Sequence, residues 1–247
     1  MLVSLVGELE AVRGGEIPAT HGDLLQGAIF KALKELDEGA ASRLHGTAEG
    51  SPRPYTISQV SGVEAVDGVL RLEPGQGCWF RITGLTAEAS LALLALSERL
   101  HGWTLYSSRG RVPFQVRQWR TEGHPWAALL SGEDLARRAM ESYRASPQRI
   151  VLEFRTPVCF ELDGKKGWGS WMPFPLPELV FGSLRHRITS YRQEFGQPPS
   201  REDLASALAV GRVELSSRML HFERHNRRRS GVVGLCEYLI DREAGRE

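Results

Sequence analysis

Cysteine is scarce in this sequence, and the spacing of the few cysteine residues does not suggest disulfide bonds. The 247-residue chain has three cysteines, Cys78, Cys159 and Cys236, which lie far apart and never form a CxxC pair. An odd number of isolated thiols argues against a disulfide framework, and the missing CxxC spacing argues against a thiolate zinc site. We therefore expect these cysteines to be small buried thiols.

Long apolar runs and several common catalytic signatures are also absent. No stretch approaches the ~20 apolar residues that a membrane-spanning helix needs, and the opening MLVSLVGELE does not resemble a signal peptide, so we expect a cytoplasmic protein. The sequence has no HExxH zinc motif, no GxSxG nucleophile elbow and no phosphate-binding GKS/T loop. Apolar residues make up 41% of the chain, which is enough for one large or two small domains to bury a core.

An excess of charge of one sign is missing as well. The formal net charge is +1, so any binding of a polyanion must be local. The local candidate is ERHNRRRS at residues 223–230, where a histidine accompanies Arg224, Arg227, Arg228 and Arg229. The run is either a polyanion-binding element or a solvated basic turn.

The first half of the chain alternates between strand and helix signals. Residues 2–10 alternate apolar and polar side chains like a half-buried strand, and a Thr20-to-Asp23 capping pattern precedes an apolar helical stripe over 24–36. A short helix over 40–45 should end at Gly46. Strands are predicted over 54–60, 68–74, 77–85 and 112–120, with a second amphipathic helix over 86–100. This β-α-β-β-α-β order predicts a ferredoxin-like domain over residues 1–122.

The second half repeats the beginning of this pattern after a linker with a helix, residues 123–148. A strand over 149–154 precedes a helix with the apolar stripe Leu176, Val180, Leu184, Ile188 and Tyr191. An extra helix over 201–208 and strands over 213–222 and 231–240 follow, and the arginine run forms the turn between these strands. The fold class is therefore α+β with two tandem ferredoxin-like domains, the second over 149–247 and incomplete at its C-terminus.

Two sets of segments resemble one protein family. THGDLLQGAIFKAL, RLHG and RPYTIS lie in order within residues 20–58, and FRTPVCF, MPFPLPELVFGSLRHRI and GVVGLCEYLI within residues 154–240. Together they resemble the CRISPR repeat-processing endoribonucleases of the sixth Cas family, in the RAMP superfamily. The resemblance implies an RNA-binding nuclease of antiviral defence that cleaves the precursor transcript within each CRISPR repeat. It also implies a reaction without metal or cofactor, in which the 2′-hydroxyl attacks the scissile phosphate and a 2′,3′-cyclic phosphate is left.

The resemblance also assigns site residues. His45 in RLHG matches the family's catalytic histidine, and the ordinary pKa of histidine, about 6.5, suits proton transfer near neutral pH. Arg53 lies roughly where many relatives have a lysine, and because arginine keeps its proton, its expected role is electrostatic. Phe30 replaces a tyrosine of some relatives, so no phenolic hydroxyl is expected there; Phe30 and His21 are candidate auxiliary residues.

Each assignment has an ordinary structural alternative. A histidine at a helix C-terminus is commonly a cap, and a phenylalanine such as Phe30 is commonly a packing residue. Arg53 is otherwise an exposed cation before a strand, and His21 a structural residue at the start of a helix.

Two other functions stay open. One is a catalytically weak or inactive repeat-RNA-binding subunit of a CRISPR effector complex. The other is a general single-strand RNA-binding module, which predicts stacking aromatic side chains on an open sheet face, although the strands show no evident aromatic pair.

The family usually ends with a further helix and a glycine-rich loop before a last strand. Within one chain we therefore expect the second sheet to leave some apolar residues uncovered, among them Val232, Leu235, Tyr238 and Ile240. We expect either that a homodimer or effector subunits bury this sheet, or that the chain alone is an aggregation-prone monomer.

Overall fold

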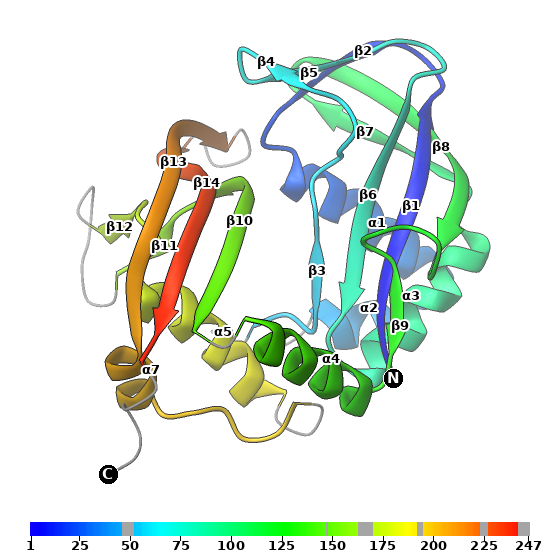
Figure 1. Cartoon of the computed structure of the whole chain (residues 1–247). Helices are drawn as coiled ribbons and strands as arrows, with labels where there is room; N and C mark the ends of the chain where they lie inside the picture. The colour runs from blue at the N-terminus through cyan, green and yellow to red at the C-terminus, as the bar shows by residue number, and fades with distance from the viewer. Residues whose placement is uncertain (46–51, 147, 163–169, 192–194, 223–226, 242–247) are drawn as a thin grey trace. The chain divides into compact units, whose positions relative to one another are not determined.

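In the computed structural model the chain divides into two units, Met1–Glu133 and Asp134–Glu247 (Figure 1). The structure describes all residues except 46–51, 147, 163–169, 192–194, 223–226 and 242–247. Within these described ranges, no helix is both long enough and apolar enough to cross a membrane.

The first unit is built on an antiparallel sheet with the strand order β3-β6-β1-β8-β7, and β9 pairs with β1. Its part β8-β1-β6-β3 has the 4-1-3-2 order of a ferredoxin-like sheet, as predicted. The elements are β1 (Leu2–Ala11), β2 (Gly15–Pro18), α1 (Gly22–Leu36), α2 (Glu38–His45), β3 (Tyr55–Ile57), β4 (Ala65–Val66), β5 (Val69–Leu72), β6 (Gly77–Gly84), α3 (Ala87–Arg99), β7 (Gly102–Ser107), β8 (Gly110–Arg120) and β9 (Ala128–Leu130).

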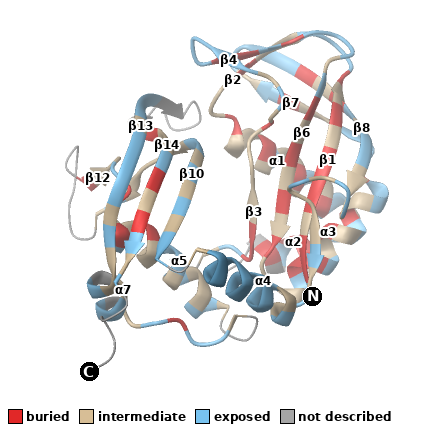
Figure 2. Cartoon of the chain, in the orientation of Figure 1, coloured by how far each residue is buried: buried red, intermediate tan, exposed pale blue. Residues whose placement is uncertain are grey.

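The core of this unit lies between one face of the sheet and the helices α1 and α3 (Figure 2). Leu25, Ile29 and Leu33 recur every four residues on α1, so they form one buried stripe. Phe80 and Ile82 are buried on β6. Because successive strand residues point to opposite faces, Trp79 and Arg81 lie on the face turned away from the helices.

The start of α1 differs from the prediction. The capping pattern predicted a cap at Thr20, yet the helix begins at Gly22 with His21 at the N-cap position and no side-chain capping hydrogen bond. The reason is that His21 is buried and its ring nitrogens bond to other parts of the chain. In contrast, α3 has a side-chain cap, because the Ala89 amide donates to Thr86 Oγ1 at 3.1 Å.

The second unit contains a sheet with the order β10-β14-β13 and a short β11-β12 pair. With α5 between β10 and β13 along the chain, this is the predicted β-α-β-β arrangement. The elements are α4 (Gly132–Ala145), which begins just before the boundary between the units, β10 (Arg149–Val158), β11 (Phe160–Glu161), β12 (Trp171–Met172), α5 (Pro177–Ser190), α7 (Arg201–Ala207), β13 (Leu208–Phe222) and β14 (Arg227–Ile240).

Tyr238 anchors the small core of the second unit. Its side chain is fully buried, its ring packs edge-to-face against Phe181 with centroids 5.0 Å apart, and its hydroxyl donates to the Pro175 carbonyl at 2.8 Å. The core therefore forms where β14 meets α5 and the segment before it.

Two predictions about this core are partly wrong. On α5, Val180 of the predicted stripe is buried, whereas Leu184 is 46% exposed. The residues predicted to share an uncovered face instead lie on both faces of β14, because Tyr238 and Val232 are buried while Leu235 is 40% exposed.

The cysteines are unpaired thiols, as predicted. Cys78 and Cys236 are buried, and Cys159 is half-buried. Burial raises the pKa of the Cys78 thiol to about 12, so this sulfur stays protonated near neutral pH.

Candidate functional site

Four side chains of the first unit meet between α1 and the start of β3, and we call them the Tyr55 cluster: Gln26, Phe30, Arg53 and Tyr55. On α1, Gln26 and Phe30 each follow a residue of the buried stripe, so they lie at its edge. Tyr55 opens β3, which pairs with β6 and places Tyr55 opposite Gly84. The sheet register therefore positions the phenol beside the edge of the helix.

The geometry of the Tyr55 cluster centres on one hydroxyl. Tyr55 Oη accepts hydrogen bonds from Gln26 Nε2 at 2.8 Å and from Arg53 Nη1 at 3.1 Å. The Phe30 and Tyr55 rings lie with their centroids 5.1 Å apart and their planes inclined at 43°. Tyr55 is only 5% exposed, whereas Arg53 is exposed. In the Tyr55 cluster, the exposed guanidinium of Arg53 is therefore hydrogen-bonded to the buried phenol of Tyr55.

A phenolic hydroxyl that sequence reasoning did not anticipate lies beside Phe30. Phe30 itself has none, but the ring of Tyr55 packs against it. Sequence reasoning treated Tyr55 only as a strand residue. The available signal was its position two residues after Arg53, because alternate residues of an extended segment lie on the same side.

His45 ends helix α2 in the structure. The helix is held to the core by Ala40, Ala41 and Leu44, which are all buried, and its first turn is capped by Asp37, whose Oδ1 accepts from the Ala40 amide at 2.8 Å. The His45 side chain and residues 46–51 lie outside the described part of the chain. The assignment of His45 as a catalytic residue therefore stays a prediction.

His21 has the contacts of a structural residue. It is fully buried, its Nδ1 bonds to the Pro18 carbonyl at 2.8 Å, and its Nε2 accepts from the Val60 amide at 2.8 Å. The ring is therefore neutral, with its hydrogen on Nδ1. Burial lowers the pKa of His21, and the hydrogen bond to Pro18 opposes that shift. Because these contacts explain His21, we do not place it in the candidate site.

The predicted basic turn lies at the end of the β13–β14 hairpin. These strands pair as far as Phe222 opposite Arg227, and Arg224 lies outside the described residues, as do the side chains of Arg227 and Arg228. Arg229 is described, and its guanidinium carbon lies 3.3 Å from the centroid of the Trp171 ring. Stacking on an aromatic ring orients the Arg229 guanidinium.

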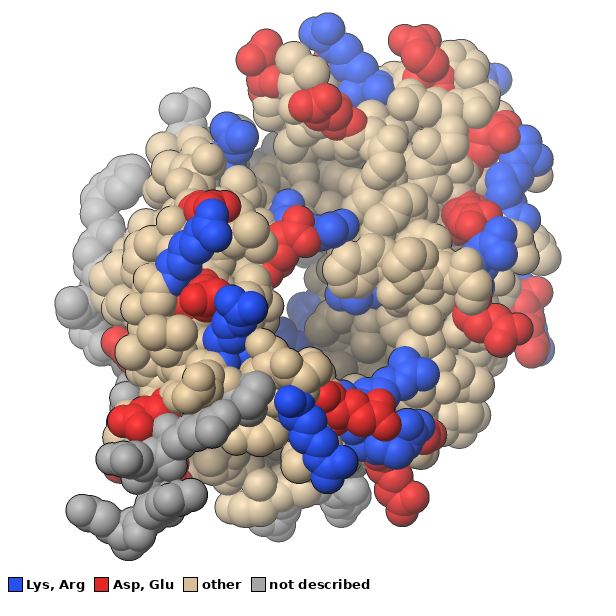
Figure 3. Space-filling view, viewed as in Figure 1, with Lys and Arg blue, Asp and Glu red and all other residues tan. Residues whose placement is uncertain are grey.

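The sheet face of the second unit turned away from α5 has mixed charge. Figure 3 shows basic and acidic side chains interspersed over this unit. Neighbouring side chains form the ion pairs Arg149–Glu237, Arg155–Glu153 and Arg212–Glu214. This face is therefore not a continuous basic surface.

The open face of the first unit carries aromatic side chains that sequence reasoning missed. Trp79 of β6 meets His124 with ring centroids 4.9 Å apart, and the guanidinium of Arg81 lies 5.0 Å from the Trp126 ring centroid. His124 lies outside the strands and far from Trp79 in sequence, so a reading of the strands alone could not find this pair.

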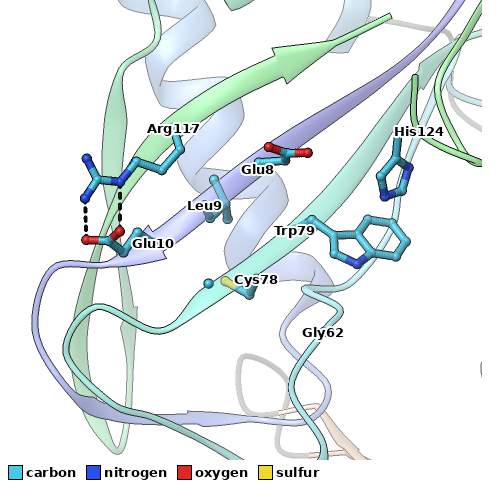
Figure 4. Close-up of a pocket in the computed structure, with 9 residues that line it drawn as sticks. Glu8, Leu9, Glu10, Gly62, Cys78, Trp79, Arg117 and His124 are labelled. Atoms are coloured by element: carbon cyan, nitrogen blue, oxygen red, sulfur yellow. Dashed lines mark hydrogen bonds and ion pairs between the residues drawn. The ribbon is translucent and has the colours of Figure 1, made fainter. Parts of the chain in front are cut away.

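A pocket of about 370 Å³ lies beside Trp79 on this face (Figure 4). Its two carboxylates are both paired: Glu10 accepts from Arg117 Nε at 2.8 Å, and Glu8 pairs with Arg120. The hydrogen bond from Arg117 holds the pKa of Glu10 below its ordinary value, so Glu10 is ionised near neutral pH. Among the described residues, no group of three or more His, Cys, Asp or Glu side chains is arranged to hold a metal ion.

Comparison with known proteins gives structural matches only. No protein-family model and no curated protein sequence matches the chain. A Cas6 product complex matches with a TM-score of 0.63 and 24% identity over 98% of this chain and 84% of that chain. This chain has the Cas6 fold.

Two further structures extend the comparison. A product complex of Thermus thermophilus Cas6 matches with a TM-score of 0.65 and 21% identity over 100% of this chain and 87% of that chain. A RAMP protein that binds different RNA substrates matches with a TM-score of 0.59 and 14% identity over 99% of this chain and 90% of that chain. The Cas6 fold thus accounts for both units and confirms the predicted pair of tandem ferredoxin-like domains.

Proposed function

We propose that this chain is a Cas6-type endoribonuclease that binds CRISPR repeat RNA and cuts it within each repeat without a metal ion. The Cas6 fold over both units supports this proposal. The observation that carries it is the Tyr55 cluster, which holds an arginine on the segment between the end of α2 at His45 and the start of β3. The sequence resemblance assigns the catalytic histidine and its cationic partner to that same segment.

In the proposed reaction the ribose 2′-oxygen forms a bond to the phosphorus while the bond to the 5′-oxygen breaks. His45 takes the proton of the 2′-hydroxyl, and the leaving 5′-oxygen receives a proton from solvent. The products are a 2′,3′-cyclic phosphate and a 5′-hydroxyl. The cationic guanidinium of Arg53 stabilises, through its N–H groups, the negative charge that develops on the phosphorane.

We also propose that the β13–β14 hairpin, which we call the basic hairpin because of its arginine run, binds the RNA backbone through Arg224, Arg227, Arg228 and Arg229. The stacking of Arg229 on Trp171 supports this role, because an oriented guanidinium loses less conformational entropy when it meets a phosphate. Each arginine that binds a phosphate releases counterions from the RNA, so binding should weaken as salt rises.

A labelled transcript of the CRISPR repeat of the source genome tests the proposal. We expect a single cut that leaves a cyclic phosphate and that is unchanged by a chelator. A 2′-deoxy substitution at the nucleotide before the cut should abolish cleavage while binding survives. Loss of cleavage with the chelator, restored by magnesium, would contradict the metal-free mechanism. Tight binding without any cut would instead identify a repeat-binding subunit.

A further inference from the structure

We propose that Tyr55 is a positioning residue that holds the Arg53 guanidinium toward the scissile phosphate through its hydroxyl. The consequence for cleavage rests on the proposed function, whereas the restraint on Arg53 does not. The two hydrogen bonds at Tyr55 Oη, from Gln26 Nε2 at 2.8 Å and from Arg53 Nη1 at 3.1 Å, are the observation behind this inference.

Tyr55 can serve as a fixed anchor because its own position is strongly determined. The ring is 5% exposed and packs against Phe30, and the backbone is held in β3 opposite Gly84. Gln26, on a helix whose stripe is buried in the core, supplies a second hydrogen bond to the same oxygen. The hydroxyl therefore has one location relative to the sheet and to α1.

A neutral anchor suits a cation that has to meet a phosphate. Elsewhere in the first unit, arginine side chains pair with carboxylates, as Arg117 does with Glu10 and Arg120 with Glu8. Among the ion pairs between described residues, none involves Arg53. A phenol restrains one nitrogen of the guanidinium and leaves its positive charge uncompensated, whereas a carboxylate would cancel much of that charge before RNA arrives.

Restraint also matters because Arg53 is exposed. A free arginine side chain samples many rotamers, and binding a phosphate in one of them costs conformational entropy. Catalysis needs donors that are already in place when charge develops on the phosphorane. By holding Arg53, Tyr55 contributes to cleavage without touching the reacting atoms.

The restraint itself is tested in the RNA-free full-length chain by NMR of the arginine guanidinium groups. In the wild type we expect resolved Nη signals for Arg53, which report slow rotation of its guanidinium. In Tyr55→Phe these signals should merge, while the ring packing and the melting temperature are retained. Tyr106→Phe is the matched control, because Tyr106 is 66% exposed in the same unit. Merged Arg53 signals in the wild type, or signals unchanged in Tyr55→Phe, would overturn the inference whether or not the protein cleaves RNA.

The role in cleavage is tested by a double-mutant cycle on the repeat transcript. Tyr55→Phe should lower the single-turnover rate about tenfold in the wild-type background, which is the loss of roughly one oriented hydrogen bond. In the Arg53→Ala background the same substitution should change the rate less than about twofold, since Tyr55 acts through Arg53. Equal losses in both backgrounds would show a packing role instead. If the wild type does not cleave, the proposed activity fails. The same double-mutant cycle is then measured on the affinity for the 2′-deoxy transcript. Equal losses of affinity in both backgrounds would again reject the coupling between Tyr55 and Arg53.

Discussion

Replacement of His21 by leucine should destabilise the first unit by roughly 2–6 kcal/mol at pH 7.5. His21 is fully buried and bonds to the Pro18 carbonyl and the Val60 amide, each at 2.8 Å. Leucine fills a similar volume but satisfies neither group, and each unsatisfied buried polar group costs about 1–3 kcal/mol. The substitution should therefore unfold the first unit at a clearly lower urea concentration.

The size of this effect should depend on pH. Burial lowers the pKa of His21 in the folded chain, so below about pH 6.5 the unfolded chain binds a proton that the folded chain does not. Folding stability from His21 is thus fully present above pH 6.5 and falls as the pH drops, by up to about 1.4 kcal/mol per pH unit. The stability gap between wild type and His21→Leu should narrow by up to about that amount between pH 7.5 and pH 5.5.

Urea unfolding followed by tryptophan fluorescence measures both effects, because the first unit contains four of the six tryptophans, Trp79, Trp103, Trp119 and Trp126. His101→Leu is the control, since His101 is exposed, and it should change stability by less than about 0.5 kcal/mol. The reasoning is refuted if His21→Leu is as stable as this control, or if its gap to the wild type is the same at both pH values.

Three further predictions concern the candidate site and the hairpin. His45→Ala should lower the single-turnover cleavage rate by roughly 10²-fold with little loss of affinity, whereas Arg53→Ala should reduce both; a normal rate in His45→Ala rejects the assignment. Alanine at all four arginines of the basic hairpin should flatten the plot of log affinity against log salt by somewhat under one unit for each phosphate that the hairpin no longer binds, and an unchanged slope would show a merely solvated surface. Gly234→Ala should lower the melting temperature markedly, because φ is +125° and a Cβ would lie 2.0 Å from the Glu214 carbonyl oxygen; Gly182→Ala on α5, with nothing within 4 Å, should not.

The long elements were predictable because each has a repeated local signal. The apolar alternation of β1 and the helical spacing of α1 and α3 extend over enough residues for the pattern to identify the element. The strands β2, β4, β7 and β9 were missed, because strands of two to six residues are too short to establish a period. The capping pattern at Thr20 failed for a related reason: burial of His21 beside Val60, which is 39 residues away, decided the helix start.

The α+β class and the β-α-β-β-α-β order of the first half could be predicted from the sequence, because they depend on neighbouring residues. The roles of His45 and Arg53 come from the family resemblance and stay predictions. Only the tertiary structure decided that Tyr55 joins Gln26, 29 residues earlier, and that Trp79 meets His124 on the open face. Both contacts depend on strand register and on the packing of α1 against the sheet. No local pattern encodes which distant side chains a shared core brings together, and the candidate site is made of such contacts.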